Sequence, residues 1–476
     1  MVEQINITTE LLNVISPSQA WEHRIVPYKL DTAIHFFTDS TDITTQNGLA
    51  DELEVILGQL IVFESTSKTE LEYLLNKHYR LNQNERNEVK QYTKKADDFL
   101  DVLIEEAKQL KSSDIHIEAY EEEGRVRVRI DGKLIERYKI DKSQYPSLIN
   151  KVKIKARLDI AEKRLPQDGR IEYNNNGHKV DIRVSVLPTL HGEKVVMRLL
   201  SNDATNIQID SLGFKPDELN RYKEAIKQPN GILLISGPTG SGKTTTLYAT
   251  LKLLNQVDTN VVTIEDPIEY TLEGINQVQL KEDIGLDFTK ALKTFLRQDP
   301  DVIMLGEIRD ADTANMAIRA ALTGHLVLST IHTNSAWGTV TRLIDMGVPP
   351  FLIASTFNAS VAQRLVRVLC SNCTKEVEHQ PHELPKGFKP PIQLKTQFEA
   401  VGCEQCYHTG YSGRLAVYEV IPFDLELAEA IKRGDFEIRE LLKERNIKSL
   451  ADNAFELLVQ GVTTISEVYP ILTNAN

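Results

Sequence analysis

The spacing of apolar and polar positions changes along the chain, and these changes predict three α/β regions. Residues 1 to about 85 combine short apolar runs at 34–37 and 61–63 with helical spacing over 51–59 and 69–79. In residues 125–130, valine or isoleucine alternates with arginine, and Asp131-Gly132 supplies a hairpin turn. From about residue 212, short continuous apolar runs alternate with helical spacing, which predicts a largely parallel sheet.

Domain boundaries follow from these changes of pattern. We expect an α/β, multidomain protein with two small α/β domains at residues 1–88 and 97–205, followed by a larger α/β domain at 212–476. A helix over 97–110 opens the second domain, and a second hairpin spans residues 171–186. The polar stretches 81–89 and 201–211 are expected to be linkers. Arg125, Arg127 and Arg129 predict a solvated strand face; contact with phosphate or a neighbouring subunit is the alternative.

The segment 231–245, GILLISGPTGSGKTT, has the pattern of a phosphate-binding loop between a buried strand and a helix. Lys243 can supply a charge for the β- and γ-phosphates, and Thr244 can place its hydroxyl on Mg²⁺. A glycine-rich turn without a ligand is the alternative. The candidate phosphate-binding residues are Gly237, Pro238, Thr239, Gly240, Ser241, Gly242, Lys243, Thr244 and Thr245.

Polar clusters follow the later strands of the same domain, where parallel sheets bind ligands. Glu307 is expected to hold Mg²⁺, Glu265 or Glu269 to orient or deprotonate the attacking water, and Asp266 to support either role. His332 can sense the γ-phosphate. Helix caps, ion pairs and structural hydrogen bonds are the alternatives for all of them. The candidates for positive charge at the transition state are Arg183, Arg198, Arg297 and Arg309.

All four cysteines form two C-x-x-C pairs, Cys370/Cys373 and Cys403/Cys406, separated by 29 residues. This spacing suits a structural tetrahedral Zn²⁺ site, and a redox pair or unbound thiols are the alternatives. The proline-rich insert between the pairs is expected to fold as a loop pinned by the metal.

Composition changes the picture in two ways. The net charge of −13 argues against a nucleic-acid partner, because phosphate backbones require a basic surface. The sequence shows no signal peptide pattern and no apolar run that approaches the length of a membrane span. We therefore expect a cytoplasmic protein whose attachment to a membrane comes through a partner.

The chain resembles the traffic ATPases of bacterial type II secretion and type IV pilus assembly from about residue 97 to its end. Residues 1 to about 85 resemble more loosely the family's first N-terminal domain. The segments that carry the resemblance, besides the two cysteine pairs, are SSDIHIE, RLPQDGRI, GPTGSGKTTTLYATL, TIEDPIEY, INQVQ, LRQDPDVIMLGEIRD, AIRAALTGHLVLSTIHTN and AQRLVRVLC.

This resemblance implies a RecA-like P-loop core, ATP as substrate and a homohexamer. It also implies that Arg183 and Arg198 reach the nucleotide from the second domain, and that Arg297 and Arg309 match family arginines of the motor domain. Glu265–Glu269 match the family's aspartate box, Glu307 its second nucleotide-binding motif and His332 its histidine box. The expected partners are an inner-membrane platform and its cytoplasmic adaptor. Ala119, Lys293 and residues 280–283 depart from the family pattern, and Lys293 puts a contact between subunits in doubt.

The function expected from the resemblance is a motor for type II secretion, with type IV pilus assembly second. The cysteine pairs and the N-terminal domain favour an assembly motor over a pilus retraction motor. A nucleic-acid translocase and a nucleotide-gated scaffold without turnover are the alternatives of other classes.

Overall fold

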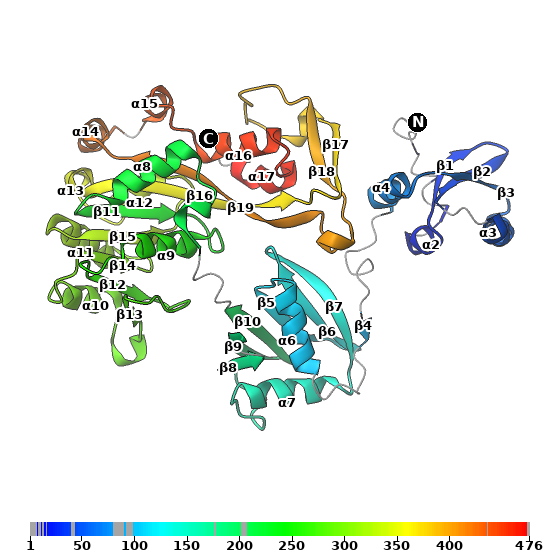
Figure 1. Ribbon diagram of the computed structural model, residues 1–476, viewed down its shortest axis with the longest axis horizontal. Coiled ribbons are helices and arrows are strands. Elements are labelled where there is room, and N and C mark those ends of the chain that lie inside the picture. The colour runs from blue at the N-terminus through cyan, green and yellow to red at the C-terminus, as the bar shows by residue number, and fades with distance from the viewer. Residues whose placement is uncertain are drawn as a thin grey trace.

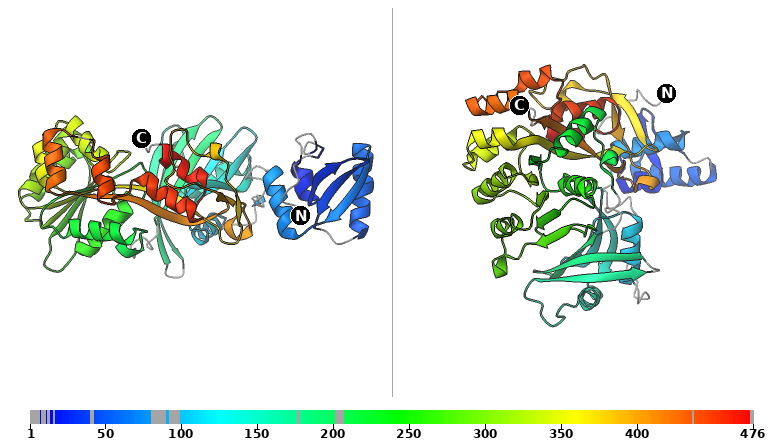
Figure 2. Two further views of the ribbon diagram at one scale, coloured as in Figure 1. Left: turned by 90° about the horizontal axis from the view of Figure 1, so that it is seen from above. Right: turned by 60° about the vertical axis from the view of Figure 1, so that its left-hand side comes forward.

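The computed structural model describes residues 7, 11, 14–15, 17–39, 43–79, 90–91, 99–175, 178–200, 207–435 and 437–473. Three bodies follow one another along the chain, with the N-terminal body at one end of the molecule (Figures 1 and 2). The expected linker 81–89, the turn residues 176–177 of the second hairpin and most of the linker 201–211 lie outside the described residues.

The N-terminal body is a three-stranded sheet in the order β1-β2-β3, with β2 and β3 parallel. Phe36, Leu71 and Leu75 are fully buried in its core. Ser67 caps α4 in a reciprocal capping box with Glu70. The first helix predicted for this domain, at 51–59, begins at Ile43 and ends at Leu57. The elements are α2 (Pro17–Glu22), β1 (Ile25–Leu30), β2 (Ala33–Thr38), α3 (Ile43–Leu57), β3 (Leu60–Ser65) and α4 (Lys68–His78).

The middle body is a seven-stranded sheet in the order β4-β7-β6-β5-β10-β9-β8. Val126, Val128 and Ile182 face a core shared with α6 and α7, as their alternation predicts. The elements are β4 (Lys90–Gln91), α6 (Phe99–Gln109), β5 (Asp114–Ala119), β6 (Glu123–Ile130), β7 (Lys133–Asp141), α7 (Tyr145–Lys155), β8 (Gln167–Asn175), β9 (His178–Thr189) and β10 (Gly192–Leu200).

The arginine face of β6 differs from the freely solvated face that its sequence predicts. Arg125 and Arg127 donate to Glu118 at 3.0 and 2.8 Å, and Arg129 lies 3.3 Å from Asp114. The two carboxylates are less than a tenth exposed, so the arginines compensate the cost of burying them.

The large body is a seven-stranded sheet in the order β13-β12-β14-β15-β11-β16-β19, parallel except for β19. Ile232 and Leu234 of β11 pack into one core, while Leu233 and Ile235 pack into a second core on the other face. A strand covered on both faces explains the continuous apolar run in the sequence. The first half comprises α8 (Pro216–Ile226), β11 (Gly231–Ser236), α9 (Lys243–Leu254), β12 (Val261–Glu265), β13 (Asn276–Gln279), α10 (Phe288–Phe295), β14 (Val302–Leu305), α11 (Ala311–Leu322) and β15 (Leu326–Ile331).

The second half of this body contains the insert. The insert folds as a two-stranded antiparallel ribbon, β17 (Thr374–Glu378) with β18 (Thr396–Ala400), so the expectation of a loop alone was wrong. Backbone pairing gives the ribbon a structure that its many prolines conceal. The other elements are α12 (Gly338–Asp345), α13 (Pro350–Thr356), β16 (Phe357–Leu369), β19 (Tyr411–Pro422), α14 (Leu425–Arg433), α15 (Arg439–Glu444), α16 (Leu450–Val459) and α17 (Ile465–Thr473). Within the described ranges, no helix has both the length and the apolarity that a membrane crossing requires.

Glu419 on β19 makes stability depend on pH. Its carboxylate accepts a hydrogen bond from Leu450 N–H at 3.4 Å, and burial raises its pKa from 4.5 to about 7. The folded chain therefore retains this proton at pH values where the unfolded chain has lost it, so the stabilisation is full below pH 4.5 and is lost as the pH rises through about 7. Relative to Glu419→Gln, we expect the wild type to lose on the order of 3 kcal/mol of unfolding free energy between pH 4.5 and 7.

Urea unfolding of both proteins at several pH values measures this difference. Glu444→Gln changes an exposed glutamate of the same body and serves as the control. A wild-type-minus-variant difference that is constant with pH for Glu419→Gln contradicts the prediction.

Candidate nucleotide site and cysteine cluster

The loop between β11 and α9 is shaped to receive an anion. Gly237 has a φ of 151°, and a Cβ there would lie 2.5 Å from the carbonyl oxygen of Gln363, so only glycine fits. Gly242 takes the left-handed conformation directly before α9. No side chain caps α9, which leaves its first backbone N–H groups directed into the loop.

Lys243 is the first residue of α9, and its side chain reaches back to this loop. Its Nζ donates to the carbonyl oxygens of Gly237 and Pro238 at 2.8 and 3.1 Å. Burial lowers the pKa of the Lys243 ammonium, while the nearby Glu307 carboxylate acts in the opposite direction. The ammonium is therefore held by two neutral carbonyl groups that phosphate oxygens can replace. Thr244, next to it, is exposed.

Three side chains from the ends of β14 and β15 form a cluster beside the loop. Glu307 accepts a hydrogen bond from Arg309 and lies 3.3 Å from Nε2 of His332. Arg309 is also 4.0 Å from Asp266, which follows β12. Burial by itself would raise the pKa of the Glu307 carboxyl, but Arg309 and His332 outweigh it and hold this pKa below its ordinary value. Glu307 is thus an ionised carboxylate close to Lys243.

The two glutamates proposed for the attacking water have very different surroundings. Glu265 is only 3% exposed, and its oxygens accept hydrogen bonds from Tyr248, Thr263 and Gln277. Glu269 is 36% exposed in its side chain and lies 3.5 Å from a guanidinium nitrogen of Arg183. The Glu265 carboxylate is therefore engaged in hydrogen bonds within the protein, whereas the Glu269 carboxylate is partly exposed to solvent.

The four candidate arginines do not converge on one point. Arg183 reaches across from the middle body and donates to the carbonyl oxygen of Ile268, and Arg309 joins the Glu307 cluster. Arg198 instead pairs with Asp114 at 3.1 Å, and Arg297 donates to the carbonyl of Lys293 within its own helical segment. Among the described residues, neither Arg198 nor Arg297 forms a hydrogen bond or an ion pair with the loop or with Glu307.

Two neighbours of the site escaped sequence reasoning. Arg364 on β16 donates to Asn334 O at 3.1 Å and to Gln363 O at 3.0 Å, and burial lowers its pKa. It stands close enough to the loop that a Cβ on Gly237 would come within 3.1 Å of its guanidinium. Tyr248 on α9 holds Glu265. The only signal for Arg364 was its position within the apolar strand segment AQRLVRVLC.

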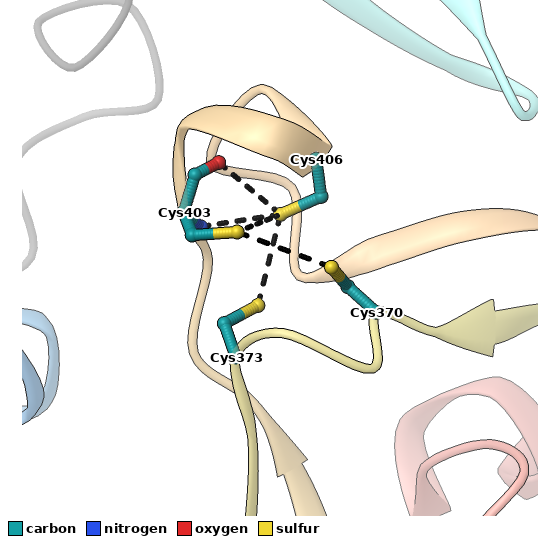
Figure 3. A group of neighbouring side chains, drawn as sticks. All are labelled: Cys370, Cys373, Cys403 and Cys406. Atoms are coloured by element: carbon teal, nitrogen blue, oxygen red, sulfur yellow. Dashed lines mark hydrogen bonds between the residues drawn. The ribbon is translucent and has the colours of Figure 1, made fainter.

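The four cysteines converge at the base of the insert (Figure 3). The sulfur atoms of Cys370 and Cys403 are 3.9 Å apart, and Sγ of Cys406 lies 3.7 Å from those of Cys373 and Cys403. Tetrahedral zinc with bonds of about 2.3 Å requires sulfurs about 3.8 Å apart. The amides of Cys403 and Gly410 each donate to Sγ of Cys406 at 3.2 Å, as expected around a thiolate. The cluster is therefore compatible with zinc.

The parallel sheet, the loop after β11 and the carboxylates at neighbouring strand ends define a P-loop ATPase. The chain belongs to the family described as "Type II/IV secretion system protein", which it matches over residues 90–470. Membership of this family of ATPases confirms the expected activity, hydrolysis of ATP, and the resemblance on which it was based.

Several relatives cover most of the chain. The type IV pilus assembly ATPase PilB of Myxococcus xanthus is 40% identical over an alignment of 500 positions, which covers 98% of this chain and 87% of the relative. The type II secretion system protein HxcR of Pseudomonas aeruginosa is 45% identical over 378 residues, 79% of this chain and 77% of the relative. The type II secretion system ATPase E of Vibrio cholerae is 45% identical over 377 residues, 78% of this chain and 74% of the relative.

Solved structures share the fold. The Legionella pneumophila ATPase DotB aligns with a TM-score of 0.62 at 22% identity, over 82% of this chain and 100% of that one. The pilus retraction motor PilT with bound ADP aligns with a TM-score of 0.53 at 24% identity, over 78% and 95%. These likenesses confirm the α/β fold class.

Proposed function

We propose that this ATPase is a cytoplasmic motor that couples ATP hydrolysis to the assembly of pilin-like subunits in a type II secretion system. The observation that carries the proposal is the convergence of Lys243, Glu307 and the uncapped start of α9 at one edge of the sheet. The relatives that are named as secretion and pilus ATPases support the coupling to assembly. Type IV pilus assembly is the second candidate, favoured by the pilus relative that spans 98% of the chain.

We assign the phosphate groups to residues 237–245 and the γ-phosphate to Lys243. Thr244 and Glu307 would hold Mg²⁺, which neutralises charge on the phosphates when it is bound. His332 and Arg309 keep the Glu307 carboxylate ionised and oriented for that role. Arg183 brings positive charge from the domain at 97–205 to the edge of the domain at 212–476.

We propose Glu269 rather than Glu265 as the residue that activates water. A general base needs a free lone pair within reach of the water, and the hydrogen bonds of Glu265 are already committed to Tyr248, Thr263 and Gln277. Glu265 then acts by fixing α9 to β12. Glu269→Gln is expected to lower kcat about 100-fold without changing the melting temperature, whereas Glu265→Gln is expected to lower the melting temperature.

Phosphate release and thermal melting of the two variants test this assignment, and each variant is the matched control for the other. The opposite result, in which Glu269→Gln hydrolyses ATP normally and Glu265→Gln is stable but inactive, would transfer the role to Glu265.

The proposed assembly is a homohexamer at the inner membrane, docked on a membrane platform through a cytoplasmic adaptor and the domain at 1–88. Phosphate release by the purified full chain is measured with membrane vesicles that contain the platform and adaptor, with empty vesicles and with duplex DNA. A severalfold stimulation by the loaded vesicles alone supports the motor. Stimulation by DNA alone would instead favour a nucleic-acid translocase.

We propose that the four cysteines bind one structural Zn²⁺ per chain. The sulfur separations and the two amide donors around Cys406 support this ligand set. Elemental analysis is expected to find about one zinc per chain in the wild type and almost none in Cys370→Ser/Cys373→Ser, with a lower melting temperature for the variant. Ser371→Ala changes a residue between the same two cysteines and should retain zinc. If wild-type protein that was purified in the absence of chelators contained no zinc, the site would be refuted.

A further inference from the structure

The turn between β6 and β7 lies against the large body, far from the nucleotide loop in the sequence. The β6–β7 hairpin points toward the beginning of β19 (Figure 1). Asp131, at the tip, accepts a hydrogen bond from the backbone N–H of Gly413 at 2.8 Å. Its other carboxylate oxygen lies 3.6 Å from the guanidinium of Arg414. Arg129 stabilises the turn from inside by donating to the carbonyl of Gly132 at 3.0 Å.

The surface that contacts this turn is held together by hydrogen bonds and a cation–π contact. Glu467 on α17 accepts hydrogen bonds from the backbone N–H and the guanidinium of Arg367 at 3.0 and 2.8 Å. The Arg367 guanidinium stacks 3.7 Å above the ring of Tyr411. The Tyr411 hydroxyl is in turn 2.8 Å from that of Thr464. We call Gly413, Arg414 and Glu467 the turn socket.

The charges of the turn and of the socket are complementary. Asp131 faces Arg414, and Lys133 is close enough to Glu467 to influence its ionisation. Burial alone would raise the pKa of Glu467, yet Arg367 and, more weakly, Lys133 hold it below its ordinary value. Asp131 thus lies beside Arg414, and Lys133 favours the charged form of Glu467 through a weaker electrostatic effect. Both interactions join opposite charges, which favours one orientation of docking.

The same sheet carries a second contact with the large body. β6 pairs with β5, β5 with β10 and β10 with β9, so Asp131 and Arg183 belong to one continuous sheet. Arg183 contacts Ile268 and Glu269 at the nucleotide edge, while Asp131 contacts the socket. A rigid sheet held at two separate points has little freedom to rotate about either one.

We propose that Asp131 is a positioning residue, which seats the β6–β7 turn in the turn socket and thereby sets where Arg183 meets Glu269. The proposal rests on the proposed function of Arg183 and Glu269 in ATP hydrolysis. The turn then enters and leaves the turn socket with each movement of the middle body against the large body. The side chain of Arg414 is 45% exposed, so this pair is screened by solvent and breaks easily, as a contact that must be released requires.

A charge exchange tests the pairing in the full-length chain. Asp131→Lys and Arg414→Glu are each expected to lower kcat/KM for ATP about threefold at low salt. The double variant should recover part of the loss, because it restores the ion pair but not the acceptor for the Gly413 amide. Asp131→Asn is the matched control, because asparagine tolerates the left-handed backbone at this position and still accepts the Gly413 hydrogen bond. It should lose less than Asp131→Lys. A double variant no better than the worse single variant would overturn the pairing.

Two further readouts separate positioning from a general effect on folding. Hydrogen exchange at the Gly413 amide should be severalfold faster in Asp131→Gly, which keeps the turn but removes the acceptor. In an Arg183→Ala background, Asp131→Lys should have no further effect on kcat/KM. Unchanged exchange at Gly413 would overturn the seating, and additive losses would overturn the link to Arg183.

The exchange measurement needs no turnover, so it keeps the two proposals distinguishable. If the wild type hydrolysed no ATP while Asp131→Gly still accelerated exchange at Gly413, the proposed function would fail but the seating of the turn would stand.

Discussion

Lys243→Ala is expected to lower steady-state phosphate release to about 1% of the wild-type rate or less. In the structure the Lys243 ammonium is held by the carbonyl groups of Gly237 and Pro238, at the place where the loop and the start of α9 direct their N–H groups. When phosphates enter, this ammonium exchanges two neutral acceptors for oxygens that carry negative charge, and the interaction strengthens as charge develops on the transferred group. Alanine removes that charge and leaves the loop backbone in place.

Lys252→Ala is the matched control for this variant. Lys252 belongs to the last turn of the same helix, so the substitution removes the same charge and has the same helix propensity, but it acts at the opposite end of α9. Malachite-green assays of the two variants at saturating Mg-ATP compare them directly. Equal rates for Lys243→Ala and Lys252→Ala would refute the role given to Lys243.

Glu307→Gln is expected to lower the rate of ATP hydrolysis about 100-fold or more, while the dissociation constant for ATP changes by no more than a few fold. Glutamine has the same shape, so the hydrogen bonds with Arg309 and the contact with His332 keep their geometry. What disappears is the negative charge beside Lys243, on which the proposed magnesium site depends. A fluorescent ATP analogue measures binding, and phosphate release measures turnover.

A second signature follows from the same loss of charge. Wild-type turnover should rise with Mg²⁺ and saturate, whereas the residual turnover of Glu307→Gln should respond only at much higher Mg²⁺. Glu273→Gln changes an exposed glutamate of the same domain and should behave as the wild type. If Glu307→Gln kept the wild-type dependence on Mg²⁺, this carboxylate would have no part in holding the ion.

Local sequence patterns predicted the elements that position the site. The apolar run 232–235, the phosphate-binding loop and the helix after it are neighbours in the chain, and their order alone places Lys243 at the edge of the sheet. In the structure, Asp287 and Asp310 cap the helices that they directly precede in the sequence. Such features depend on residues only a few positions apart, which a single sequence displays.

Contacts between distant residues could not be predicted in the same way. Tyr248 of α9 donates a hydrogen bond to Glu265 of β12, and Arg364 approaches the loop from β16. Asp131 accepts a hydrogen bond from Gly413, which lies 282 positions later in the chain. The ribbon of the insert was missed because its two strands are separated by a proline-rich segment, and only their backbone pairing defines them. The pattern of β6 revealed the alternation but not the carboxylates of β5 that neutralise its arginines.

The most direct test of a motor built around this loop is multiple turnover by the wild-type chain. Purified full-length protein is incubated with excess ATP and Mg²⁺, and phosphate is followed over time. We expect continuous release that exceeds one phosphate per chain many times over and stops when Mg²⁺ is chelated. Release that ended at or below one phosphate per chain, with ATP bound and the fold intact, would contradict the motor and leave a nucleotide-gated scaffold.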